Sequence, residues 1–199
     1  EERIGELCFD DTGKAATSQI IYDVARATKF EINQDIIDLL TLAIITDTGH
    51  FKFVRYSDVF KDAAALVEAG ANITRLVNLL NNKNKKTVLM ESKVVSNAEF
   101  FMKGRLAVAT INHDDYKKLD GRGELVLGLL GQIHGVEFAV LLKEQKENQI
   151  GISLRSRRIP VNQIAESFGG GGHLCAAGAV VMDSLQNVHD KVISAFKGM

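Results

Sequence analysis

The first eighty residues repeat apolar side chains at the spacing of helix faces. In the first such segment Ile20, Ile21, Val24 and Ala25 recur three or four residues apart, which places them on one side of a helix. Polar residues and glycines separate the segments, as expected for helix caps and turns. The pattern predicts four helices, which run from Thr17 to about Phe30, from a cap at Asn33 into Thr46–Gly49, from a cap at Ser57 to Ala69, and from Ile73 to Leu80.

The second half mixes helical and strand periodicities. It follows a polar, basic run at residues 81–86 that lacks periodicity, which predicts a linker. Helices are expected at Thr87–Phe101, His113–Leu119, Glu124–Ile133, Val161–Phe168 and Val188–Phe196. Strands are expected at Arg105–Ile111, Val136–Lys143, Gln149–Arg155 and Ala179–Met182, with a hairpin turn over Lys143–Asn148. The predicted fold class is therefore α/β, with a helical first part and a mixed-sheet second part.

Composition and charge restrict the class of protein and the kind of ligand that can be expected. Hydrophobic residues make up 46% and charged residues 25% of the chain, which is ordinary for a folded globular protein. The longest apolar stretch, Leu39–Ile45, is far shorter than the roughly 20 residues of a membrane span. A net charge of -1 favours a short anionic ligand, held locally, over a long duplex. Two distant cysteines, Cys8 and Cys175, and the lack of a secretory segment favour reduced thiols in the cytoplasm.

Four consecutive glycines, Gly169–Gly172, followed by His173 are the strongest chemical signal. Glycines expose backbone N–H groups without side chains in the way, and successive N–H groups can form a concave anion site. If a helix begins at His173, its positive end adds to the attraction, and the imidazole can donate to a phosphate oxygen. A flexible linker is the alternative, but Phe168 and an Ala-Ala-Gly run flank the glycines, whereas linkers are usually Ser-rich.

A basic cluster, Ser153–Arg158, ends the strand before the glycines. Arg155 and Arg157 alternate with other residues, so they are expected on one face of the strand. Guanidinium groups bind phosphate oxygens in a bidentate manner. Because only a short helix separates this cluster from the glycines, both could bind one anion. A solvated basic strand end is the alternative.

Acidic residues offer two candidate metal positions. Asp47 follows an apolar helix and lies between two threonines and before a glycine, an arrangement suited to a ligand for a hard cation. On spacing alone, a helix-ending turn is the favoured interpretation. The His113–Asp115 run is better explained as the acidic start of a helix than as a ligand cluster.

These motifs together resemble the DHH family of phosphoesterases. Gly169–Gly178 resembles the Gly-Gly-Gly-His-x-x-Ala-Ala-Gly signature of the family's associated C-terminal domain. The family's other motifs are matched by Ser153–Arg157, by Val161–Phe168, by Ile45–Phe51 and by Ala16–Ser18, which resembles the helix start after the Asp-His-His motif. The resemblance covers nearly the whole chain.

The resemblance implies a division of the chain and a function. Residues 1–82 would be the C-terminal portion of a DHH catalytic domain, 83–86 a linker and 87–199 the associated substrate-binding domain. The family's members hydrolyse nanoRNA, pAp, and linear or cyclic dinucleotides, and include exonucleases. Two Mn²⁺ ions activate the attacking water. Carried over by position, Asp47 would be a metal ligand and catalytic residue. The substrate phosphate would be bound by Arg155, Ser156, Gly170, Gly171, Gly172 and His173.

The chain departs from the family in one respect. The family's earlier metal motifs, including Asp-His-His, are absent from the sequence, so residues 1–199 alone are expected to be inactive. A non-catalytic nucleic-acid-binding module, like the related domain that ends alanyl-tRNA synthetases, is the alternative function. Asp47 and its helical surroundings argue against it. A fragment with no function of its own is a further alternative, and the choice of substrate and homodimer formation stay open.

Overall fold

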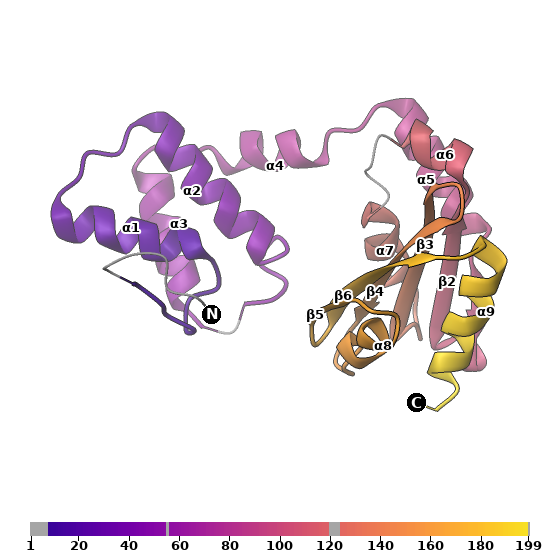
Figure 1. Ribbon diagram of the computed structural model, residues 1–199. Helices are drawn as coiled ribbons and strands as arrows, with labels where there is room; N and C mark the ends of the chain where they lie inside the picture. Colours follow the sequence, from indigo (N-terminus) through magenta and orange to yellow (C-terminus); the bar gives the residue numbers. More distant parts are fainter. Residues whose placement is uncertain (1–7, 55, 120–123, 199) are drawn as a thin grey trace. The chain divides into compact units, whose positions relative to one another are not determined.

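The computed structural model describes residues 8–54, 56–119 and 124–198 (Figure 1). The chain divides into two compact units, Glu1–Asn82 and Lys83–Met199. None of the helices in the described ranges is long and apolar enough to cross a membrane. Each unit has its own hydrophobic core, so each is considered by itself.

The first unit is helical and contains the four predicted helices. They are α1 (Thr17–Thr28), α2 (Gln34–Asp47), α3 (Asp58–Glu68) and α4 (Ile73–Asn81). Their core includes Tyr22, Ile37, Leu40, Ile44, Val59 and Leu66. The side chain of Asn33 caps α2 by accepting the N–H of Ile36, as predicted. Ser57 occupies the cap position of α3, but its side chain makes no capping hydrogen bond, so the predicted role of its hydroxyl is wrong.

The second unit is built on a mixed six-stranded sheet, which confirms the predicted α/β class. The strands are β1 (Glu99–Phe101), β2 (Leu106–Ile111), β3 (Phe138–Lys146), β4 (Gln149–Ser156), β5 (Gly171–His173) and β6 (Ala176–Met182). Their order is β1-β2-β3-β4-β6-β5. Of these described strands, only β2 and β3 pair in parallel. The helical elements are α5 (Lys85–Ser96), η1 (Met102–Gly104), α6 (His113–Lys118), α7 (Glu124–Leu130), α8 (Asn162–Ser167) and α9 (Leu185–Phe196).

Helices cover the two faces of the sheet unequally (Figure 1). On one face α8 and α9 pack against side chains from β2, β3, β4 and β6. On the other face α5, α6 and α7 pack against residues of β2 and β3, such as Ala109 and Leu141, and no β4 or β6 residue belongs to that described core cluster. The second face of β4 and β6 is therefore left uncovered by this core.

The boundaries of several elements differ from the sequence predictions. Asn84 caps α5, so Lys85 and Lys86 of the predicted linker already lie in its first turn. The helix ends at Ser96, and Phe101 lies in β1 instead of the predicted helix. The hairpin turn is shorter than predicted because β3 continues to Lys146. Apolar residues at helical spacing continue beyond the end of α5, so this spacing alone does not show where the helix ends.

Candidate functional site

The first two glycines of the run end helix α8. The N–H of Gly169 donates to the carbonyl of Glu166 at 2.9 Å, and the N–H of Gly170 donates to the carbonyl of Ala165 at 2.9 Å. This pair of bonds is a Schellman motif, in which Gly169 takes the left-handed conformation with φ of 76°. The amide of Gly170, predicted to bind phosphate, is therefore already occupied within the protein.

The last two glycines and His173 form the edge strand β5. The prediction that a helix begins at His173 is wrong, because the chain pairs with β6 in antiparallel fashion and turns back at Leu174 and Cys175. No helix dipole therefore points at this position. In the described sheet β5 is the outermost strand, and only alternate residues of an antiparallel strand bond to their neighbour. Some of its N–H groups consequently face the open edge.

Steric contacts distinguish the four glycines. A Cβ added at Gly170 would lie 2.1 Å from the carbonyl oxygen of Gly178, and one at Gly172 would lie 2.6 Å from that of Ala176. Gly169 has open space but requires its left-handed φ of 76°. Gly171 has neither constraint: nothing lies within 4 Å of an added Cβ, and its φ is outside the glycine region. The fold thus accounts for three of the glycines but not for Gly171.

The strand register brings Arg155 and His173 onto one face of the sheet. Ala176 of β6 pairs with Arg155 of β4 on one side and with His173 of β5 on the other. Side chains directly opposite one another in an antiparallel sheet share a face. The side chains of Arg155 and His173 therefore lie on either side of the Ala176 methyl group. Both side chains are exposed. Within the described ranges Arg155 makes one hydrogen bond, from Nη1 to the carbonyl of Leu154 at 3.0 Å, and most of its N–H donors have no partner among these residues.

Two other members of the basic cluster have structural roles. The hydroxyl of Ser156 donates to the carbonyl of Ile159, and its N–H donates to the carbonyl of Cys175 at 3.0 Å. Ser156 therefore fixes the turn after β4 and the neighbouring hairpin. The guanidinium of Arg157 donates to the carbonyl of Gly131 at 3.0 Å, after the end of α7. Because β4 ends at Ser156, the predicted common face of Arg155 and Arg157 does not continue that far.

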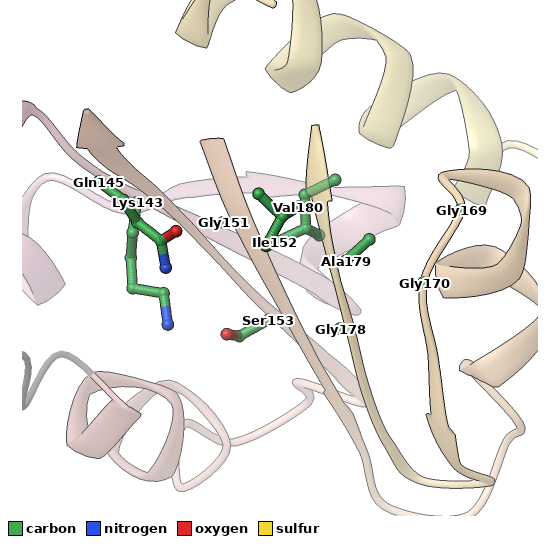
Figure 2. Close-up of a pocket in the computed structure, with 10 residues that line it drawn as sticks. All are labelled: Lys143, Gln145, Gly151, Ile152, Ser153, Gly169, Gly170, Gly178, Ala179 and Val180. Carbon is green, nitrogen blue, oxygen red and sulfur yellow. The ribbon is translucent and has the colours of Figure 1, made fainter. Parts of the chain in front are cut away.

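A cavity of about 500 Å³ is lined by residues of β3, β4 and β6 and by Gly169 and Gly170 (Figure 2). Among the described residues, its polar side chains are Lys143 and Gln145 from β3 and Ser153 from β4. Backbone and small residues complete its lining: Gly151, Ile152, Gly169, Gly170, Gly178, Ala179 and Val180. Lys143 and Gln145 were not predicted from the sequence, and Ser153 was named there only as the first residue of the basic cluster. Alternation along Gln149–Arg155 could have placed Ser153 on the same face as Arg155, but only the register brings β3 beside them.

Comparison with known proteins identifies one domain and several relatives of the chain. Residues 103–198 match the DHHA1 domain. The bifunctional oligoribonuclease and PAP phosphatase NrnA of Thermus thermophilus is 29% identical, with 98% of this chain and 60% of the relative covered. The protein of the same name from Bacillus subtilis is 27% identical over 91% of this chain and 59% of the relative. Residues 103–198 are thus identified as a DHHA1 domain, and the similarity of nearly the whole chain to these two relatives supports the predicted resemblance to the DHH family.

The same comparisons show how much of each relative the chain covers. The chain spans about 60% of the length of these two curated relatives. An exopolyphosphatase-related protein from Bacteroides fragilis has the same fold, with a TM-score of 0.88 and 21% identity over 99% of this chain and 61% of that chain. The exposed sheet face with Arg155 and His173 lies within the DHHA1 domain.

The first unit contains the one predicted metal ligand, Asp47, but its described residues form no metal centre. Asp47 is exposed at the last residue of α2, and no hydrogen bond or ion pair involves its carboxylate within the described ranges. The neighbouring hydroxyls do not brace it, as the sequence suggested: Thr46 donates to the carbonyl of Ala43 and Thr48 to that of Ile44. No group of three metal-binding side chains occurs among the residues that the structure describes. These residues alone therefore do not fit a two-metal site.

The His113–Asp115 run starts helix α6, as the sequence favoured. Asn112 caps the helix by accepting the N–H of Asp115 at 2.9 Å. The carboxylate of Asp115 accepts hydrogen bonds from Lys93 and Lys118, and these two bonds lower its pKa. Asp115 thus links α6 to α5, and its carboxylate is paired with the ammonium groups of Lys93 and Lys118.

Proposed function

We propose that the exposed sheet face of the DHHA1 domain binds a phosphate group of a short oligonucleotide or small phosphonucleotide. The protein would act as part of a manganese-dependent phosphoesterase. The observation that carries the proposal is the shared row of Arg155, Ala176 and His173, which sets two donor side chains on one open face of the sheet. The relatives named oligoribonuclease and PAP phosphatase support a nucleotide as the ligand.

Each group in the row has a distinct part in binding. The guanidinium of Arg155 presents a planar pair of N–H donors, which matches two phosphate oxygens. His173 adds a donor from the opposite side of the row. Gly171 precedes it on β5 by two residues, so it shares the face of His173, and its missing side chain lets a ligand approach the strand. Ser156 and Gly170, which the resemblance placed in this site, would act indirectly by holding the strand and turn.

The proposed metal is Mn²⁺, with Asp47 as one ligand. Bound metal would polarise the phosphoester and supply the activated water. A carboxylate oxygen is a suitable ligand for such a hard cation, and the Asp47 carboxylate is accessible. One carboxylate does not hold two ions, so Asp47 is proposed as one ligand of the metal centre and not as the whole of it.

The phosphate requirement can be tested without hydrolysis. We expect 5′-AMP to raise the melting temperature of the 199-residue chain, because a ligand that binds only the folded state stabilises it by mass action. Adenosine is the matched control, since it keeps the base and sugar but lacks the phosphate. Thermal unfolding in EDTA with a series of concentrations of each ligand measures the difference. Equal stabilisation by adenosine and 5′-AMP would show that the site does not recognise phosphate.

A further inference from the structure

We propose that the cavity is a nucleobase subsite, in which the Gln145 amide pairs with the edge of an adenine whose phosphate is held by Arg155 and His173. The inference rests on the proposed function and names the nucleotide that the phosphate site takes. It makes Gln145 a specificity-determining residue. Lys143 and Ser153, which also line the cavity, each have an interaction within the protein, so neither is assigned a hydrogen bond to the ligand.

The strand register places the cavity in line with the phosphate site. Gly151 lies four residues before Arg155 on β4, so both positions face the same side of the sheet, roughly 13 Å apart along the strand. On the neighbouring strand β6, Ala176 pairs with Arg155 and Val180 pairs with Gly151. Gly178 lies between Ala176 and Val180 on the same face. A nucleotide whose phosphate is bound at Arg155 can therefore run over these two small residues and place its base beside Val180.

Gly151 is a glycine that the conformation of β4 does not require. Its φ lies outside the range that favours glycine, and the three atoms nearest to an added Cβ all belong to the flexible side chain of Gln145. At Gly178, by contrast, the carbonyl oxygen of Ile152 excludes a side chain. A glycine inside a strand weakens it and often marks the close approach of a ligand. Gly151 keeps the floor of the cavity at the level of the backbone, where a flat ring can lie.

Gln145 supplies a polar edge beside this floor. The pairing of β3 with β4 shifts register between Glu144 and Lys146, so Gln145 is the extra residue of a β-bulge. Bulges re-aim a side chain and are frequent next to active sites. The side chain lies across Gly151, on the side of β4 away from Val180 (Figure 2). Among the described residues its amide makes no hydrogen bond, although Gln145 is only partly exposed.

These groups match the shape and polarity of adenine. Val180 is 55% exposed, and Met182, two residues further along the same face, is 72% exposed, so apolar side chains are available to contact the flat surface of a base. The amide of Gln145 can accept a hydrogen bond from the N6 amino group of adenine and donate one to N7. Guanine presents two acceptors, O6 and N7, at the same edge, so the Gln145 carbonyl would face an oxygen.

This pose leaves a phosphate free for the proposed hydrolysis. It uses the phosphate at Arg155 and His173 and the base of the same nucleoside. In a nucleoside 3′,5′-bisphosphate or a dinucleotide, the other ribose hydroxyl carries a second phosphate, which neither the cavity nor the Arg155 row holds. That second phosphate is the one available to the metal-assisted reaction.

NMR titration of the 199-residue chain in EDTA with 5′-AMP, 5′-GMP and ribose 5-phosphate tests this inference. Ribose 5-phosphate keeps the phosphate and the sugar but lacks the base. We expect 5′-AMP to bind about tenfold more tightly than 5′-GMP. Gln145→Met keeps a side chain of similar length without the amide, so it should weaken 5′-AMP binding about tenfold and abolish the preference. Its affinity for ribose 5-phosphate should stay within about twofold of the unmodified chain.

Two further variants complete the comparison. Gln132→Met makes the same change at an exposed glutamine outside the described lining of the cavity, so it should leave all three affinities unchanged. Gly151→Val suits a strand but raises the floor and displaces the flexible end of Gln145. It should reduce the affinities for 5′-AMP and 5′-GMP to that for ribose 5-phosphate.

The outcomes separate this inference from the proposed function. Equal affinities for 5′-AMP and 5′-GMP, or unchanged 5′-AMP affinity in Gln145→Met, would overturn the nucleobase subsite, while binding of ribose 5-phosphate left the phosphate site standing. Failure of the unmodified chain to bind any of the three ligands would overturn both. If circular dichroism shows that Gly151→Val does not fold, Gln145→Met decides the question, because it changes a partly exposed side chain.

Discussion

Replacing Arg155 with alanine is expected to weaken 5′-AMP binding by about tenfold to hundredfold. A hydrogen bond to a charged group contributes about 1.5–3 kcal/mol, and Arg155 can offer two such bonds to one phosphate. The fold should be little affected, because the side chain is exposed and its one hydrogen bond to a described residue is to the carbonyl of Leu154. Isothermal titration calorimetry of both proteins in EDTA measures the effect.

Arg157→Ala is the matched control for the loss of positive charge. Arg157 lies two residues further along the chain, but its guanidinium is directed to the carbonyls of Gly131 and Ile133. Its removal should leave 5′-AMP affinity within about twofold of the unmodified chain. If both arginine variants lost affinity equally, the effect would come from overall charge and not from a phosphate site at Arg155.

Valine at Gly170 and valine at Gly171 are expected to have opposite effects, although the two positions are adjacent. At Gly170 the added Cβ would lie 2.1 Å from the carbonyl oxygen of Gly178 and 2.6 Å from atoms of Ala179. Neither neighbour can move without shifting β6. Overpacking of this kind costs about 1–3 kcal/mol or more, so Gly170→Val should lower the melting temperature by several degrees.

Gly171→Val should leave stability nearly unchanged and abolish most nucleotide binding. Nothing lies within 4 Å of the added Cβ, and valine suits an extended strand. The new side chain would occupy the space through which a phosphate approaches β5. Thermal unfolding and calorimetry of both variants provide the comparison. A stable Gly171→Val protein with full 5′-AMP affinity would remove the glycine run from the binding site.

Much of the fold could be predicted because helix periodicity and caps are local. Asn33 and Asn84 mark helix starts through bonds to residues three positions later, and such signals are present in the sequence itself. The mixed sheet followed from short β-rich segments between helices. The extent of α5 was wrong because Phe101 continues the apolar spacing of that helix although it lies in β1.

The site was harder to predict because it depends on pairing between distant segments. The glycine run was expected to be one anion-binding loop, but it divides into a Schellman motif at Gly169 and Gly170 and an edge strand at Gly171 and Gly172. The local sequence does not distinguish the two pairs of glycines. A side chain at Gly170 is excluded by the backbone of β6, which is a separate segment of the chain. For the same reason Lys143 could not be placed beside Ser153 before the register of β3 and β4 was known.

The most direct test of the phosphate site is a ¹⁵N-edited NMR titration of the 199-residue chain with 5′-AMP. We expect saturable shifts of the backbone amides of Gly171, Gly172 and His173 and of the Arg155 guanidinium N–H, because these groups line the proposed site. Amides of α9, which packs on the opposite face of the sheet, should not shift. Calorimetric binding of 5′-AMP that leaves the amides of Gly171–His173 unshifted would contradict the account.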